Sequence, residues 1–394
     1  MNILTLNAGS SSIKYKAYQI INQQLSPLVS GLIEGIGESE GAWHHTKTSK
    51  ETQSHHFKTH EKAYAALAKQ LKIDLENYPI HGVGHRVVHG GKHYFEPTII
   101  NDEVLENIRA LSKLAPIHNP INAEGIQFAR QYYPEAIHVA IFDSGFHHTM
   151  PMRARQYAIN AEVAMKYQIQ RYGFHGINHE YVARQAALFL NKPLSSCNLI
   201  TLHLGNGASA CLIKNGQSID TSMGMTPLAG LIMGTRCGDI DPAITIYLQQ
   251  QGLSPEDVDN LLNKHSGLKG IANENDMRRL LSRALADDES AQLAIDMYVY
   301  AIQKIIGAYY SQLPDLDALV FTGGVGENAS LIREKIIAAL HHLGFKLDTE
   351  LNLAHSKETC HKISKSDKPV LVIRGDEEAL MAQKVALCIF AANN

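Results

Sequence analysis

Two arginines stand in settings where an ordinary surface charge would be out of place. Arg86 lies in "GHRVVHGG" and Arg236 in "MGTRCGDIDP", both apolar and rich in glycine. An unpaired buried charge is costly, so such an arginine has an anionic partner, either a substrate or an acid of the chain. Asp239 and Asp241 are close enough in sequence to pair with Arg236, and this structural alternative stays open.

One histidine and two acids complete the set of residues that could do chemistry. His175 stands between aromatic and glycine residues in "QRYGFHGINH", although most of the 21 histidines must be bystanders. Asp143 follows the apolar run "AIHVAIFD", and Glu377 follows "PVLVI" in "GDEEA". Each acid ends a predicted buried strand, where it either points into a cleft or begins a helix.

Three turns with glycine follow apolar strands: Asn7 to Ser10, Gly205-Asn206-Gly207, and Gly323-Gly324-Val325-Gly326. Glycine lets backbone N–H groups converge on an anion, although each turn alone is also what a tight connection requires. The sequence has no GxxxxGK[ST], and no GxGxxG that opens a helix with an acid about 20 residues on. It is therefore neither a P-loop protein nor a Rossmann dinucleotide-binding protein.

The elements that must position these residues indicate an α/β fold. Strands are predicted at 2–7, 12–20 and 136–143, and helices at 61–72 and 102–114. A second half repeats the strand, turn and strand of the opening at 197–213 and adds strands at the starts of 316–330 and 369–382. We expect two related α/β domains that face each other across a cleft.

Composition excludes several classes of protein. The chain has 394 residues and a net charge of -3, which gives no basic surface for nucleic acid or an acidic membrane. The five cysteines are odd in number and scattered, so neither a disulfide framework nor a zinc site is predicted. The N-terminus does not resemble a signal peptide, and the apolar stretch 291–313 carries Asp296 and Lys304. We expect a cytoplasmic protein without a membrane span.

Together these stretches resemble the acetate kinase (acetokinase) family, within the superfamily of sugar kinases, actin and heat-shock ATPases. The resemblance rests on "LNAGSSSIKY", "HRVVHGG", "APIHNP", "FDSGFHHTMP", "RYGFHGINH", "HLGNGASA", "DTSMGMTPLAGLIMGTRCGDIDP" and "FTGGVGEN", in this order. It implies two ribonuclease-H-like (actin-like) domains around a nucleotide cleft. The expected bounds are 1–148 and 149–378, with a C-terminal helix at 379–394 that packs back on the first domain.

The resemblance also implies a reaction. The γ-phosphoryl group of ATP would pass directly, in line and reversibly, to acetate, giving acetyl phosphate and ADP. Mg²⁺, or alternatively Mn²⁺, would be the metal cofactor, and the protein would be a homodimer. Neither a nucleic acid nor a membrane is expected as a partner.

Site residues follow by matching the motifs of the family one by one. Asp143, His175 and Arg236 would be catalytic, and Asn7 and Glu377 would hold the metal, the glutamate through water. Substrate-binding residues would be Arg86, Val88, Ile117, Phe174 and Pro227. Nucleotide and phosphate contacts would come from Ser10, Ser12, Lys14, His203, Gly205, Asn206, Gly207, Asp276, Arg278, Gly323, Gly324, Gly326 and Glu327.

The chain departs from the family pattern at several positions, and rival functions remain. Gly375-Asp376 replaces Thr-Asn or Thr-Asp before the paired glutamates, and Cys237 follows Arg236 where serine is common.

A propionate or butyrate kinase is the first rival function, because one methylene shifts binding by only about 1–3 kcal/mol. An actin-like regulatory ATPase is the second, and a sugar kinase, which needs a firm Asp base, is the third.

Overall fold

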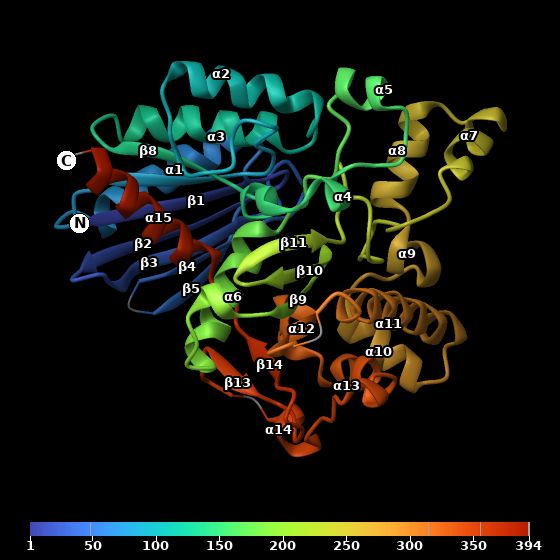
Figure 1. The fold of residues 1–394 in the computed structure, drawn as a ribbon. Coiled ribbons are helices and arrows are strands. Elements are labelled where there is room, and N and C mark those ends of the chain that lie inside the picture. The colour runs from blue at the N-terminus through green and yellow to red at the C-terminus, as the bar shows by residue number, and fades with distance from the viewer. Residues whose placement is uncertain (48, 314, 355, 393–394) are drawn as a thin grey trace. The chain divides into compact units, whose positions relative to one another are not determined.

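The computed structural model describes residues 1–47, 49–313, 315–354 and 356–392. The chain divides into two compact units. The first unit comprises Met1–Gly145 together with Asp376–Asn394, and the second comprises Phe146–Gly375. Each unit is built on its own mixed sheet (Figure 1).

The first unit contains an eight-stranded sheet in the order β5-β4-β3-β2-β1-β6-β8-β7. Strand β1 pairs antiparallel with β2 and parallel with β6, which in turn pairs parallel with β8. Its elements are β1 (Asn2–Gly9), β2 (Ser12–Ile21), β3 (Gln24–Glu34), β4 (Ala42–Thr46), β5 (Lys50–Ser54), α1 (His60–Asp74), β6 (Gly82–Val87), β7 (Thr98–Ile99), α2 (Asp102–Ala110), α3 (Asn119–Tyr132), β8 (Ile137–Phe142) and α15 (Glu377–Ala392).

Helices cover both faces of this sheet, as the alternation of side chains along β6 requires. Val83 belongs to the core cluster that includes Leu67 of α1 and Ala129 of α3. Gly82 lies against Val385 of α15, where a Cβ atom would come within 2.8 Å of a methyl group. The C-terminal helix therefore packs close to β6 because β6 presents glycine on that face (Figure 1).

The second unit contains a six-stranded sheet in the order β11-β10-β9-β12-β14-β13. Its elements are α4 (Met152–Arg155), α5 (Ala161–Lys166), α6 (Gly176–Phe189), β9 (Leu199–Leu204), β10 (Ala208–Lys214), β11 (Gln217–Thr221), α7 (Ala243–Gln250), α8 (Pro255–Lys264), α9 (Gly267–Ala272), α10 (Met277–Leu285), α11 (Glu289–Tyr310), β12 (Ala318–Thr322), α12 (Gly323–Asn328), α13 (Ser330–Ala338), α14 (Thr349–Leu353), β13 (Cys360–Lys362) and β14 (Val370–Ile373).

The two sheets repeat one topology, which explains the repeat of strand, turn and strand in the sequence. In each, a first strand pairs antiparallel with the second, and the third strand follows it outward. On its other side the first strand of each sheet starts a parallel run, which is β1, β6 and β8 in the first unit and β9, β12 and β14 in the second. The α/β class and the related architecture of the two halves are thus confirmed.

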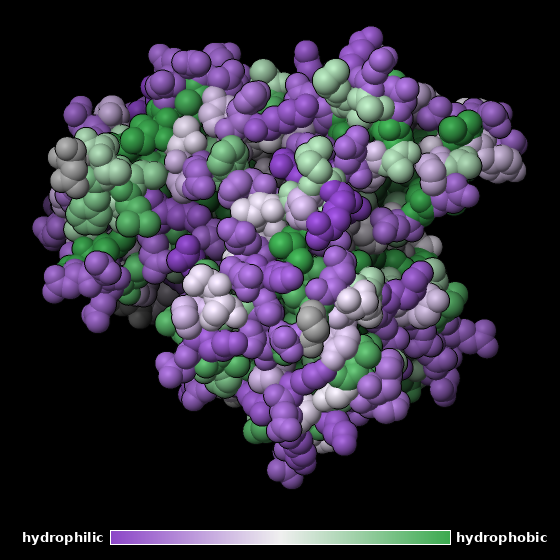
Figure 2. Space-filling model, in the orientation of Figure 1, coloured by the Kyte–Doolittle hydropathy of each residue, from purple (hydrophilic) through white to green (hydrophobic). Residues whose placement is uncertain are grey.

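Most predicted elements are present, with shifted ends. Helix α1 covers the predicted 61–72 and α11 covers most of 291–313, whereas α2 ends at Ala110 and a single 3-10 turn continues to Lys113. Within the described residues no helix is long and apolar enough to cross a membrane. The face seen in Figure 2 is mainly hydrophilic, with apolar side chains in small groups.

Candidate active site

In the first unit three predicted site residues come from adjacent parallel strands. Asn7 lies near the end of β1, Arg86 near the end of β6, and Asp143 directly after β8. Because these strands are neighbours and run parallel, their carboxyl ends meet at one edge of the sheet. That edge is where ligands bind in open α/β sheets.

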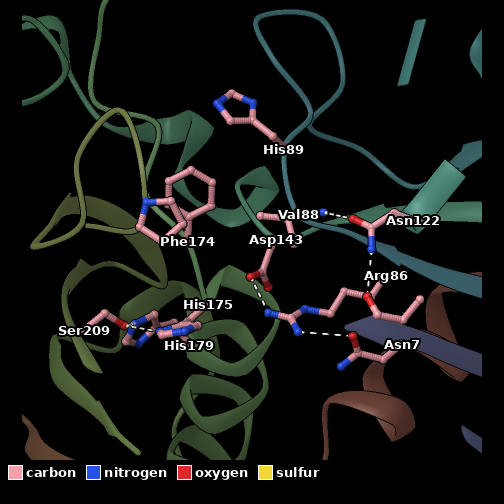
Figure 3. Close-up of polar contacts among 12 residues, drawn as sticks. Asn7, Arg86, Val88, His89, Asn122, Asp143, Phe174, His175, His179 and Ser209 are labelled. Carbon is pink, nitrogen blue, oxygen red and sulfur yellow. Dashed lines mark hydrogen bonds and ion pairs between the residues drawn. The ribbon is translucent and has the colours of Figure 1, made fainter. Parts of the chain in front are cut away.

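Arg86 joins the other two residues (Figure 3). Its Nη2 lies 2.7 Å from Oδ2 of Asp143, and its Nη1 donates to Oδ1 of Asn7 at 3.3 Å. Burial alone would lower the pKa of Arg86, but the charges of Asp143 and Glu377 offset it and raise that pKa. Its Nε is buried and has no hydrogen-bond partner among the described residues, so this N–H is one of the donors left for an anionic ligand.

Carboxylates gather around this arginine at the start of α15. The pKa of Glu377 is raised to about 7. Loss of hydration is the largest cause, the charge of Arg86 opposes it, and the charges of Asp143 and Glu378 add to it. Crowded carboxylates favour a bound cation, and oxygen donors suit Mg²⁺, which keeps several waters and takes few protein ligands. The residues therefore fit the predicted metal. Among the described residues no group of three or more His, Cys, Asp or Glu is arranged to hold a metal ion by itself.

Three predicted phosphate ligands lie at the first turn and the start of β2. Ser10 is exposed and Ser12 is partly buried. The ammonium group of Lys14 lies 2.8 Å from Glu378, so the structure gives this predicted phosphate ligand a carboxylate partner. Asp376, one of the departures from the family pattern, accepts hydrogen bonds from Lys16 and Tyr18.

Two asparagines of α3 that the sequence analysis missed hold the loop after β6. Asn122 accepts from the backbone N–H of Val88 and donates to the carbonyl of Ala8 in the first turn (Figure 3). Asn119 accepts from the N–H of His89. The motif "NPIN" was the available signal, but nothing in its spacing tells which backbone groups it binds. Val88 is buried, whereas Ile117 is 39% exposed.

In the second unit the turn from β9 to β10 brings His175 and Arg236 together. A Cβ atom on Gly207 would lie 3.2 Å from Cε1 of His175, 3.3 Å from its Nε2 and 3.9 Å from Nη1 of Arg236. Both side chains thus border the same glycine. His203 of β9 stacks on His175, with ring centroids 4.2 Å apart.

The backbone at His175 is strained. This residue is the N-cap of α6 and has the left-handed values φ 58° and ψ 20°. Non-glycine residues rarely adopt that conformation, and such outliers gather at functional sites. The imidazole of this residue lies beside the second turn. Phe174, immediately before it, is only 1% exposed.

Arg236 lies on the long loop between β11 and α7. Its Nη1 donates to the carbonyl of Pro227 at 3.1 Å. The first turn of α9 supports the loop, because the N–H groups of Leu268 and Lys269 donate to carbonyls at Met233 and Gly234. The two acids considered as structural partners bond elsewhere: Asp239 accepts from the N–H of Gly230, and Asp241 from that of Ala243.

The third turn opens α12 directly after β12. Gly323 has φ +79°, and its N–H donates to the carboxylate of Glu327, which also accepts from the N–H of Gly375. Glu327 therefore clamps the turn. Gly324 is exposed and Gly326 is buried. A Cβ atom on Gly205 would lie 3.9 Å from the N–H of Gly324, so the second and third turns are neighbours.

The predicted nucleotide residues of the "ENDMRR" segment bond mainly to each other. Asp276 caps α10 through the N–H of Arg278 and pairs with the guanidinium of the same residue. The hydrogen bond from the guanidinium of Arg278 is the main cause that lowers the pKa of Asp276 to about 2. The neighbouring Asn275 donates to Oδ1 of Asn206 at 3.1 Å, which ties this segment to the second turn.

Comparison with known proteins agrees with these features. The sequence model of the Acetokinase family matches residues 2–383. A protein named acetate kinase from Sulfurovum is 46% identical over 99% of both chains, and one from Lawsonia intracellularis is 44% identical over 97% of this chain and 98% of its own.

Solved structures give the same result. A propionate kinase from Francisella tularensis has a TM-score of 0.92 at 41% identity and covers 98% of this chain and 99% of its own. An acetate kinase from Porphyromonas gingivalis has a TM-score of 0.89 at 36% identity, with the same coverage. The resemblance inferred from the motifs is thus confirmed over nearly the whole length, and the chain belongs to the acetokinase family of enzymes.

Proposed function

We propose that the protein is an acetate kinase that transfers the γ-phosphoryl group of ATP reversibly to acetate. An acetate oxygen forms the new bond to phosphorus as the bond to the ADP oxygen breaks, which gives acetyl phosphate and ADP. Such a transition state needs alignment and positive charge around the equatorial oxygens rather than covalent help. Arg236 and His175 at the second turn are suited to that task.

The observation that carries the proposal is the ion pair between Arg86 and Asp143. At 2.7 Å from a guanidinium group, the carboxylate of Asp143 orients Arg86. A sugar hydroxyl needs a base to remove its proton, whereas a carboxylate acceptor is already ionised at neutral pH. Arginine has five N–H donors, and those of Arg86 that Asn7 and Asp143 do not use suit the carboxylate of acetate.

The other assignments complete the proposal. Asn7 and Glu377 would hold Mg²⁺, which supplies positive charge to the phosphates when it is bound. The three turns would bind the nucleotide through backbone N–H groups. Apolar contacts to the acyl methyl group would come from Val88, Ile117, Phe174 and Pro227.

Assembly and location belong to the same proposal. Exposed apolar residues recur along α11 at Leu293, Met297 and Tyr300, which are 55%, 40% and 62% exposed. We infer a homodimer that covers this face, to be tested by light scattering. All five cysteines are free, which agrees with a reducing cytoplasm.

The test measures ADP formation from Mg-ATP with acetate, propionate, butyrate or no acid. We expect turnover that requires a carboxylate and is fastest with acetate. Arg236→Ala should abolish it, whereas Arg109→Ala, which removes an exposed arginine of α2, should not. Faster turnover with propionate, the substrate in the name of the Francisella relative, would show that propionate is the preferred acceptor. The proposed phosphoryl transfer to a carboxylate would still stand. Turnover indifferent to every acid would defeat the proposal in favour of a regulatory ATPase.

A further inference from the structure

A chain of side-chain hydrogen bonds runs from the sheet of the second unit to His175. Oγ1 of Thr201 lies 2.7 Å from Nδ1 of His179, and Nε2 of His179 lies 2.8 Å from Oγ of Ser209. The same Oγ lies 2.8 Å from Nδ1 of His175 (Figure 3). The chain therefore ends on the ring nitrogen opposite the one that borders Gly207.

Secondary structure builds this chain. His175 and His179 are four residues apart at the start of α6, so they lie on one face of the helix. Thr201 is on β9 and Ser209 is on β10, which pair antiparallel. Thr201, His179 and Ser209 are each 0% exposed, so water does not compete for these bonds.

Each link of the chain has one proton to give. Each hydroxyl carries one hydrogen, and a neutral imidazole carries one N–H. His179 is neutral because burial, followed by the charges of His147 and His203, lowers its pKa well below the usual value. If Ser209 accepted from both imidazoles, its own buried hydrogen would have no partner, so the groups all donate in one direction or all in the other.

Thr201 sets the direction. Among the described residues the only hydrogen bond of its hydroxyl is the one to His179. If Thr201 accepted from Nδ1–H, its own buried hydrogen would have no partner, and such a group is costly. Thr201 therefore donates to His179, His179 donates from Nε2 to Ser209, and Ser209 donates to Nδ1 of His175.

We propose that Thr201, His179 and Ser209 are positioning residues that hold His175 in the neutral tautomer with its proton on Nε2. This inference rests on the proposed function, in which Nε2 donates to the transferring phosphoryl group. The chain thereby presents a donor, rather than a lone pair, to an anion at the second turn. The reverse tautomer would repel the phosphoryl oxygens.

The test reads the tautomer of His175 by ¹⁵N NMR of the full chain labelled at histidine, at pH 8 and without substrate. The signal is assigned by its loss in His175→Gln. We expect the Nε2–H form in the wild type. Ser209→Ala and Thr201→Val should give mixed tautomers and lower kcat roughly five- to tenfold, with a smaller change in KM. Thr201→Ser keeps the hydroxyl and should restore both readouts.

Thr221→Val is the matched control. It removes another buried threonine hydroxyl of the same sheet. That hydroxyl donates to the carbonyl of Ala210 and takes no part in the hydrogen bonds that lead to His175. A wild-type His175 with its proton on Nδ1 would overturn the inference, and so would Thr201→Val and Ser209→Ala proteins with an unchanged tautomer. If Ser209→Ala does not fold, the wild-type spectrum and the comparison of Thr201→Val with Thr201→Ser still test the inference. Failure of the proposed function appears separately, as wild-type protein without carboxylate-dependent turnover.

Discussion

The space beside Gly207 is the most demanding requirement at the scale of single residues. A methyl group there would lie 3.2 Å from Cε1 of His175, tighter than ordinary van der Waals contact. Gly207→Ala should therefore displace the imidazole and lower kcat by roughly tenfold or more, with little loss of stability, because small misplacements at the reacting centre are expensive.

Gly307→Ala on α11 is the matched control for that experiment. Apart from its chain neighbours and the backbone of its own helix, no atom of the described residues lies within 4 Å of the position that its Cβ would take. Alanine in a helix interior stabilises by roughly 1 kcal/mol relative to glycine, so this variant should melt slightly higher and keep its kcat. Equal activity in Gly207→Ala and Gly307→Ala would contradict the placement of His175.

The sequence analysis named the charged residues of the candidate site but missed several residues that hold them in place. Arg86, Asp143, His175 and Arg236 were recognisable because a charge in an apolar, glycine-rich stretch requires a partner. Asn122 and Ser209 were not, because their partners are a backbone carbonyl and a ring nitrogen more than 30 positions away. Lys14 was assigned to the phosphates, and only the folded chain shows Glu378 beside its ammonium group.

At the scale of elements, the fit of α15 on β6 depends on the absence of a side chain. A Cβ atom on Gly82 would lie 2.6 Å from Cδ1 of Ile389 and 2.8 Å from Cγ1 of Val385. We predict that Gly82→Ala destabilises the protein by about 1–3 kcal/mol, as overpacking does, measured as a lower melting temperature.

Ile389→Val removes the closest atom and provides the control. The double variant Gly82→Ala/Ile389→Val should be more stable than the sum of the two single changes, since the residues are in contact. If the stability changes of the two single variants simply add in the double variant, α15 does not pack tightly against Gly82.

A buried histidine pair between β6 and β8 makes stability depend on pH. Nε2 of His85 lies 3.0 Å from Nδ1 of His138, whose Nε2 lies 3.0 Å from the carbonyl of Tyr133. Burial, with the charge of His138 second, lowers the pKa of His85 well below the usual value, and burial also lowers that of His138. The unfolded chain therefore binds more protons, and the stability present above about pH 6.5 is lost as the pH falls.

The measurement is the melting temperature between pH 8 and pH 5. We expect a decline below about pH 6.5 that is shallower in His85→Phe, whereas His342→Gln, a change at an exposed histidine, should follow the wild type. A melting temperature that rises on acidification, or an identical slope in His85→Phe, would contradict the buried neutral pair.

At the scale of the whole molecule, the repeated sheet topology explains why the sequence predicted so much of the fold. Each half begins with a strand, a glycine turn and a returning strand, and parallel strands follow, so the α/β class was visible from pattern alone. The lengths of α2 and of the 3-10 turn after it were not, because both segments are polar enough to end at several positions.

The most direct test of the central claim follows the oxygen atoms of acetate. The protein is incubated with Mg-ATP and ¹⁸O-labelled acetate, and the products are read by ³¹P NMR. Transfer of the phosphoryl group to acetate predicts acetyl phosphate with an acetate ¹⁸O bonded to phosphorus, visible as an isotope shift, and no acetyl phosphate from Arg236→Ala. Unlabelled inorganic phosphate beside ADP, with no acetyl phosphate, would mean that water is the acceptor, and would contradict an acetate kinase.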